Sequence, residues 1–111
     1  DTEGRDISAS VVTFATKTLE SNGEAVKRFM AAWDRAAADM NADPAAFGQL
    51  MLKKIRVPKN IQGEFIIPPM PRKALPTRAQ WDDVMGWMVE KELISAPLSY
   101  EDSVTADFLS E

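Results

Sequence analysis

The chain has no cysteine and no histidine, although it is 111 residues long. Without cysteine it can form neither a disulfide scaffold nor a thiolate zinc site. Without histidine it lacks the Ser-His-Asp and Cys-His arrangements of nucleophilic enzymes and the usual ligands of catalytic zinc. These two absences exclude the commonest hydrolytic and zinc-dependent chemistries.

Glycine, long apolar runs and excess positive charge are also scarce. The five glycines are scattered, so the chain has no glycine-rich phosphate loop, and it has no EF-hand spacing of acidic residues. Its longest apolar run is too short to span a bilayer. A net charge of −4 gives no basic footprint for nucleic acid. We therefore expect no cofactor, no metal and no nucleic-acid partner.

The charge is unevenly distributed along the chain. Residues 53–78 hold seven basic side chains and one acidic one, whereas residues 79–111 hold one basic and eight acidic ones. Within the basic stretch, Arg72, Lys73 and Arg78 form a local cluster that could hold an anion or a partner. The alternative is that these cations are solvated charges of a loop.

Residues 10–16 are predicted to form a strand. Their sequence, SVVTFAT, is rich in β-branched and aromatic residues. No hairpin partner lies nearby, and a lone strand cannot satisfy its own backbone groups. The strand must therefore pair with a distant segment or with one that is absent.

Two helices are predicted within residues 22–54. Ser21 and Glu24 match a capping box, and Asp43 with Pro44 marks a second helix start. The second helix is expected to end near Lys53 and Lys54, cations suited to a helix C-terminus. The first helix has an apolar stripe, with charged residues such as Asp34 on its other face. The stripe consists of Val26, Phe29, Met30, Trp33, Ala37 and Met40.

Residues 55–76 hold five of the seven prolines and show no helical periodicity. We expect them to form an extended proline-rich strap, with a brief strand at most over Gly63–Ile67. So long a connection without regular structure is unusual in a compact domain, which counts against a self-sufficient fold. Seven apolar residues are expected to pack the strap onto a surface: Ile55, Val57, Ile61, Phe65, Ile66, Ile67 and Met70.

Residues 77–109 are predicted to be helical again. Thr77 and Gln80 match a second capping box, and Ser99 with Asp102 opens a final short turn. The apolar stripe of the longer helix comprises Trp81, Val84, Met85 and Met88. Trp87 lies on the flank of this stripe, where it either touches a missing part of the protein or covers the flank of its own helix.

The acidic pairs offer no acid–base chemistry. Asp82 and Asp83 are adjacent and would point about 100° apart on a helix, so they do not face each other. We interpret them as favourable charges in the first turn of a helix, and Glu101 with Asp102 in the same way. The tryptophans and methionines at core-facing helical steps are interpreted as ordinary packing rather than a ligand pocket. They are Trp33, Trp81, Met30, Met40, Met85 and Met88.

Two runs resemble solute-binding proteins of ABC importers, in the branch that takes nitrate, sulfonate, taurine or thiamine-precursor ligands. The first is VVTFATKTLESNGEAVKRFMAAWDRAAADMNADP, and the second is LPTRAQWDDVMGWMVEKELISAPLSYEDSVTADFL. The resemblance covers about residues 10–109. Gly23 stands where the family usually has proline, and Glu92 replaces the usual helix-ending glycine, which would weaken that helix stop.

The resemblance implies an α/β fold of two hinged lobes, of which residues 1–111 would be a single partial domain from the C-terminal part. This portion would be helix-rich, with about four helices and one or two short strands, and Val11–Ala15 would border the cleft. The resemblance implies no enzymatic activity, and the ligand-binding residues stay unknown. The whole receptor would be periplasmic or a cell-surface lipoprotein, passing a small molecule to an ABC permease.

Two other functions stay open. One is a free-standing helical module whose methionine-rich faces bind a protein partner. The other is an enzyme, since pyrimidine-precursor synthases resemble the same fold family, but those enzymes rely on histidine. For a fragment whose strand and apolar faces lack neighbours, we also expect self-association.

Overall fold

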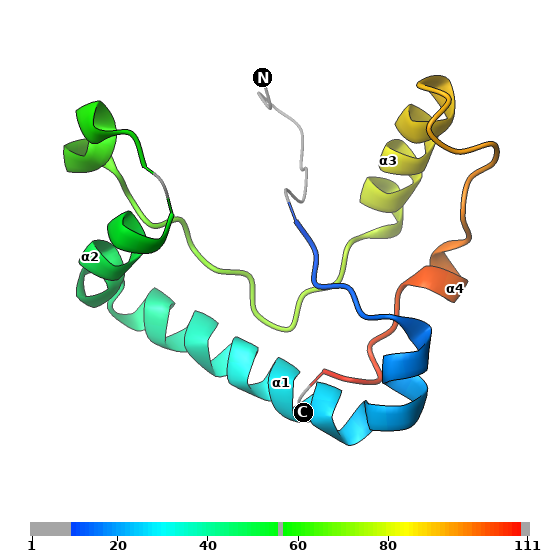
Figure 1. Cartoon of the computed structure of the whole chain (residues 1–111), viewed down its shortest axis with the longest axis horizontal. Coiled ribbons are helices and arrows are strands. Elements are labelled where there is room, and N and C mark those ends of the chain that lie inside the picture. The colour runs from blue at the N-terminus through cyan, green and yellow to red at the C-terminus, as the bar shows by residue number, and fades with distance from the viewer. Residues whose placement is uncertain (1–9, 56, 110–111) are drawn as a thin grey trace.

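Helices dominate the part of the chain that the structure describes. The structure is a computed structural model and describes residues 10–55 and 57–109 (Figure 1). The elements are α1 (Thr16–Ala42), α2 (Pro44–Lys54), the 3₁₀ helix η1 (Lys59–Glu64), α3 (Arg78–Glu90) and α4 (Tyr100–Ser103).

The predicted α/β fold class is wrong for this structure, because no strand occurs between residues 10 and 55 or between 57 and 109. The predicted strand over 10–16 is instead an extended segment, and helix α1 already begins at Thr16. The Ala15 carbonyl oxygen accepts hydrogen bonds from the backbone N–H groups of Thr18 and Leu19, which starts the helix. A strand needs a neighbour to pair with, and the described residues provide none.

The first predicted helix start is confirmed in part: a helical stretch begins after Asn22, but the predicted Ser21 capping box does not form. Helix α1 consists of two helical stretches that meet at a kink at Asn22, which has φ −136° and ψ 29°. The Ser21 hydroxyl donates to the Lys17 carbonyl oxygen (2.6 Å) instead of capping a new helix. The C-terminal segment lies against this kink: a Cβ added at Gly23 would lie 3.3 Å from the Phe108 ring.

The other helix boundaries follow the sequence signals. The Asp43 carboxylate accepts from the Ala46 backbone N–H (3.2 Å), and Pro44 begins α2, which ends at Lys54. At α3, the capping box is formed: the Gln80 N–H donates to Thr77 Oγ1 (3.2 Å) and the Thr77 N–H donates to Gln80 Oε1 (2.9 Å). These predictions are confirmed because a cap depends on neighbouring residues only.

The strap over 55–76 is largely extended, but it is interrupted by η1 at its start. The expected brief strand over Gly63–Ile67 does not form. Of the strap's apolar residues, Ile67 is buried and Val57, Phe65 and Met70 are half-buried, whereas Ile55, Ile61 and Ile66 stay exposed. The strap therefore packs through only part of its apolar side chains.

The described elements form an open arrangement rather than a closed core. In Figure 1, α1 runs along the base, α2 with η1 rises from one end, and α3 rises near the other end on the same side. The accessible surface is 9064 Å², whereas a compact monomer of this mass exposes about 6,100 Å². The radius of gyration is 16.8 Å, against about 13 Å for a compact domain of this length.

Candidate functional site

Asp34 anchors the strap to α1. The Arg72 guanidinium, in the strap, donates two hydrogen bonds to the carboxylate of Asp34: Nη2 to Oδ2 at 2.5 Å and Nε to Oδ1 at 3.1 Å. Asp34 is buried, although the sequence pattern placed it on the exposed charged face of the helix. It shares the inner face of α1 with Val26 and Ala37, both of which are also buried. A two-point bond between Arg and Asp fixes the orientation of both side chains.

The pKa of the Asp34 carboxyl is lowered below its ordinary value of 3.8. The main cause is the hydrogen bond from Arg72, to which the charges of Arg72 and Lys73 and the backbone N–H of Lys73 add, against the opposing effect of burial. The same hydrogen bond raises the pKa of Arg72. The pair is therefore ionised across the physiological pH range.

A second anchor lies two turns further along α1. The Asn41 side-chain amide donates to the Met70 carbonyl oxygen (2.9 Å), and the Met70 N–H donates to Asn41 Oδ1 (2.7 Å). Residue 70 thus meets residue 41, and residue 72 meets residue 34, so the strap runs antiparallel to α1. These two anchors hold the strap in place by polar contacts where its apolar contacts are few.

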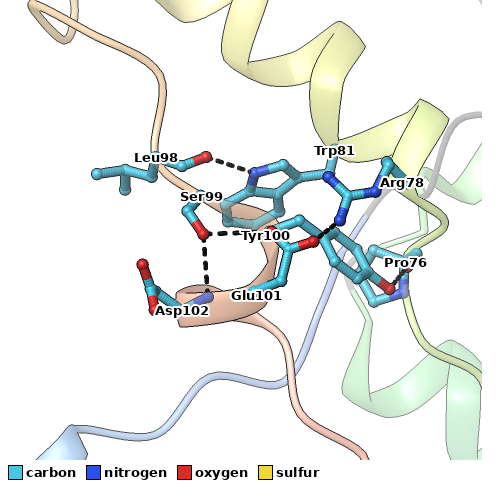
Figure 2. A network of polar contacts seen from close by, with 8 residues as sticks. All are labelled: Pro76, Arg78, Trp81, Leu98, Ser99, Tyr100, Glu101 and Asp102. Atoms are coloured by element: carbon cyan, nitrogen blue, oxygen red, sulfur yellow. Dashed lines mark hydrogen bonds and ion pairs between the residues drawn. The ribbon is translucent and has the colours of Figure 1, made fainter.

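The last third of the chain is held by a clasp between α3 and α4 (Figure 2). The Trp81 indole N–H donates to the Leu98 carbonyl oxygen (2.9 Å), and the Tyr100 hydroxyl donates to the Pro76 carbonyl oxygen (2.7 Å). The Trp81 and Tyr100 rings meet edge to face with centroids 6.3 Å apart. In the clasp the rings of Trp81 and Tyr100 are partly buried, and the indole N–H and the phenol hydroxyl each make a hydrogen bond.

The predicted basic cluster is not assembled into one site. Arg72 is committed to Asp34. Arg78 pairs with Glu101, and its guanidinium lies 4.9 Å from the centroid of the Tyr100 ring. Lys73 contributes its backbone N–H to Asp34. These residues stabilise the strap and the clasp, and the structure does not converge them on a common anion.

The predicted first-turn position is confirmed for one acidic pair and wrong for the other. Glu101 and Asp102 lie in the first turn of α4, as expected, and the Asp102 N–H donates to Ser99 Oγ (3.3 Å). Asp82 and Asp83 lie beyond the first turn of α3, because that helix begins at Arg78. The predicted first-turn placement of Asp82 and Asp83 is therefore wrong.

Three aromatic residues form a series along one side of α1 that we call the aromatic face: Phe14, Phe29 and Trp33. The rings of Phe14 and Phe29 meet edge to face at 5.7 Å, and those of Phe29 and Trp33 lie 6.1 Å apart. Phe29 is 46% exposed and Trp33 is 54% exposed. Val11 and Val12, in the extended segment before α1, are exposed as well.

The aromatic face corrects the predicted core stripe. Met30, Ala37 and Met40 face inward as expected, but Phe29 and Trp33 do not. The burial of Asp34 shows that the inner face is rotated relative to the apolar stripe. Asp34 lies four residues after Met30 and three before Ala37, and this spacing could have predicted that Asp34 shares the inner face of α1 with them.

Two kinds of site are not found among the described residues. They contain no group of three or more acidic side chains placed to hold a metal ion. No described helix combines the length and the hydropathy that crossing a membrane requires.

Comparisons with protein-family models, with curated proteins and with solved structures found no match to this chain.

Proposed function

We propose that the chain is the C-terminal portion of a non-enzymatic, extracytoplasmic solute-binding receptor. In this role it contributes to a protein that captures a small ligand, such as a sulfonate, a nitrate-like anion or a thiamine precursor, and delivers it to an ABC permease. The proposal starts from the two sequence runs that resemble these receptors. It is supported by the chain's open arrangement.

The aromatic face carries the proposal. Trp33 and Phe29 are about half exposed, in a chain whose total exposed area greatly exceeds that of a compact monomer. Contiguous exposed apolar side chains are typical of surfaces that bind another protein, a membrane or a ligand. A receptor portion would have this property, because the remainder of the receptor would cover the aromatic face.

The direct test uses the complete gene product that contains this chain. We expect the reading frame to extend upstream by more than the chain's own length and to begin with a secretion signal. We expect the thermal stability of that product to rise with one ligand among sulfonates, nitrate, bicarbonate and pyrimidines. A ligand at a hundred times its Kd adds about 2.7 kcal/mol. A gene that encodes only this chain would contradict the proposal.

Substitution of Phe29 by alanine tests the role of the aromatic face. In the isolated chain, Phe29→Ala should lower the free energy of unfolding by about 1 kcal/mol or less, because half of the ring is already in water. In the complete receptor, the same substitution should cost about 3–5 kcal/mol, as for a covered phenylalanine. Urea unfolding of both proteins measures the difference, and equal costs would mean that nothing covers this face.

The alternative is a free-standing helical module that binds a protein partner. It is favoured by the purely helical and extended structure of the described residues. In that case the aromatic face would be protected only when the partner is present, and no small ligand would stabilise the gene product.

A further inference from the structure

One end of α2 presents a patch that is both apolar and basic, and we call it the basic patch. It comprises Leu50 with Lys53 and Lys54, which lie one helical turn further on and so share its side of the helix. Leu50 is 50% exposed, and both lysines are exposed. Neither lysine makes an ion pair with any side chain that the structure describes.

Helix α3 presents a patch of the opposite charge, the acidic patch. It comprises Trp87 with Asp83 and Val84, which lie one turn earlier on the same side. Trp87 is 53% exposed and Val84 is 43% exposed. Asp83 is exposed and has no ion-pair partner among residues 10–55 and 57–109.

We propose that two copies of this chain associate, with the basic patch of each copy docked on the acidic patch of the other. The two patches match in chemistry: each has a large apolar side chain at its centre and, beside it, charges of opposite sign that form no ion pair among the described residues. Contact would cover Leu50 and Trp87 together, and it would place Lys53 or Lys54 beside Asp83 and the Trp87 ring. Ammonium groups are attracted by the face of an indole as well as by a carboxylate.

The arrangement of the helices suits a closed pair. Helices α2 and α3 rise on the same side of α1 (Figure 1). In a two-fold pair, each basic patch would meet the partner's acidic patch, so both contacts would form at once and no further copy would be added. This arrangement satisfies both patches with one partner, whereas a different protein would need to carry both complementary patches.

The chain has enough uncovered surface for such an interface. Its exposed area exceeds that of a compact monomer by about 3,000 Å², and a stable interface needs only about 800 Å² from each partner. The proposal does not rest on the receptor function, because it uses neither Phe29 nor Trp33. The aromatic face stays exposed in the pair.

A charge exchange between two variants tests the docking. One variant carries Lys53→Glu with Lys54→Glu, and the other carries Asp83→Lys. Each variant alone places like charges at the contact, so in sedimentation experiments each should dimerise at least tenfold more weakly than the wild-type 111-residue chain. Mixed in equal amounts, the two variants should form a 1:1 pair, since both contacts again join opposite charges.

Controls keep the result specific to the patches. Arg35→Glu reverses an exposed charge on α1 outside both patches, and its dimerisation should match that of the wild type. Helical circular dichroism spectra of all variants should match as well, which shows that they fold. Wild-type dimers should dissociate more readily in high salt. A wild-type chain that stays monomeric at several hundred micromolar, or charge variants that do not recover on mixing, would overturn the proposal.

Discussion

Glu92 ends helix α3 in a backbone conformation that ordinarily belongs to glycine. Its φ is 56°, its N–H donates to the Val89 carbonyl oxygen (2.9 Å), and the Leu93 N–H donates to that of Met88 (2.9 Å). These two bonds form a Schellman motif, whose left-handed position is filled by glycine in most helices. The sequence predicted that Glu92 would weaken this helix end. Both hydrogen bonds of the motif do form, but the backbone of Glu92 is strained by its left-handed conformation.

Replacing Glu92 by glycine should relieve this strain. We expect Glu92→Gly to raise the free energy of unfolding by about 1 kcal/mol, because a side chain in the left-handed region costs about that much. Thermal unfolding followed by circular dichroism measures the gain. Lys91→Gly is the matched control: Lys91 has φ −86°, so glycine gains nothing there and should destabilise the helix end. A destabilised Glu92→Gly variant would show that the strain is absent.

The ion pair between Asp34 and Arg72 should be visible as a titration. Because the folded pKa of Asp34 is lowered, the pair stabilises the fold above the ordinary value of 3.8, and this contribution is lost as the pH falls through the folded pKa. NMR titration of the Asp34 carboxyl carbon should give a pKa below 3.8. The Arg72→Ala variant should move it upward, and a pKa that does not respond to this substitution would contradict the anchor.

At the scale of the element, the Thr77 cap can be tested separately. Thr77→Ala removes the acceptor for the Gln80 N–H and should lower the free energy of unfolding by about 1 kcal/mol. Urea unfolding measures the loss. Thr13→Ala is the control, because Thr13 lies exposed in the extended segment before α1. An equal effect of the two substitutions would mean that the capping box does not stabilise α3.

The elements also show what sequence reasoning reaches. The starts of α2 and α3 were predicted because the residues that form each cap are near neighbours in the chain. The orientation of α1 was not predicted, because it depends on Arg72, which lies 38 residues after Asp34 in the chain. The ion pair between them turns Asp34 inward and leaves Phe29 and Trp33 exposed. The strand over 10–16 was wrong because its β-branched residues favour extended backbone but cannot supply a pairing partner.

At the scale of the whole molecule, the structure shows which charged side chains are paired within the chain and which stay exposed on its surface. Two cations of the basic cluster are paired within the chain: Arg72 of the strap with Asp34, and Arg78 at the start of α3 with Glu101. Lys53, Lys54 and Asp83 stay on the surface, on separate helices, beside exposed apolar side chains. The basic cluster in the sequence could therefore not predict a binding site, because ion pairs within the chain decide which charged side chains stay exposed to a partner.

The two proposals concern different surfaces of the molecule, and its tryptophans separate them. Trp33 belongs to the aromatic face, whereas Trp87 belongs to the acidic patch. Covering by the rest of a receptor should protect Trp33, and pairing of isolated chains should protect Trp87 and leave Trp33 exposed. Trp81, half-buried in the clasp, serves as an internal reference.

Hydroxyl-radical footprinting of Trp33, in the isolated chain and in the complete gene product, tests the central claim most directly. The claim is that the aromatic face is a contact surface for the remainder of a receptor. We expect Trp33 to be oxidised readily in the isolated chain and several-fold more slowly in the complete protein, with Trp81 unchanged between the two. Equal oxidation of Trp33 in both proteins would contradict the claim.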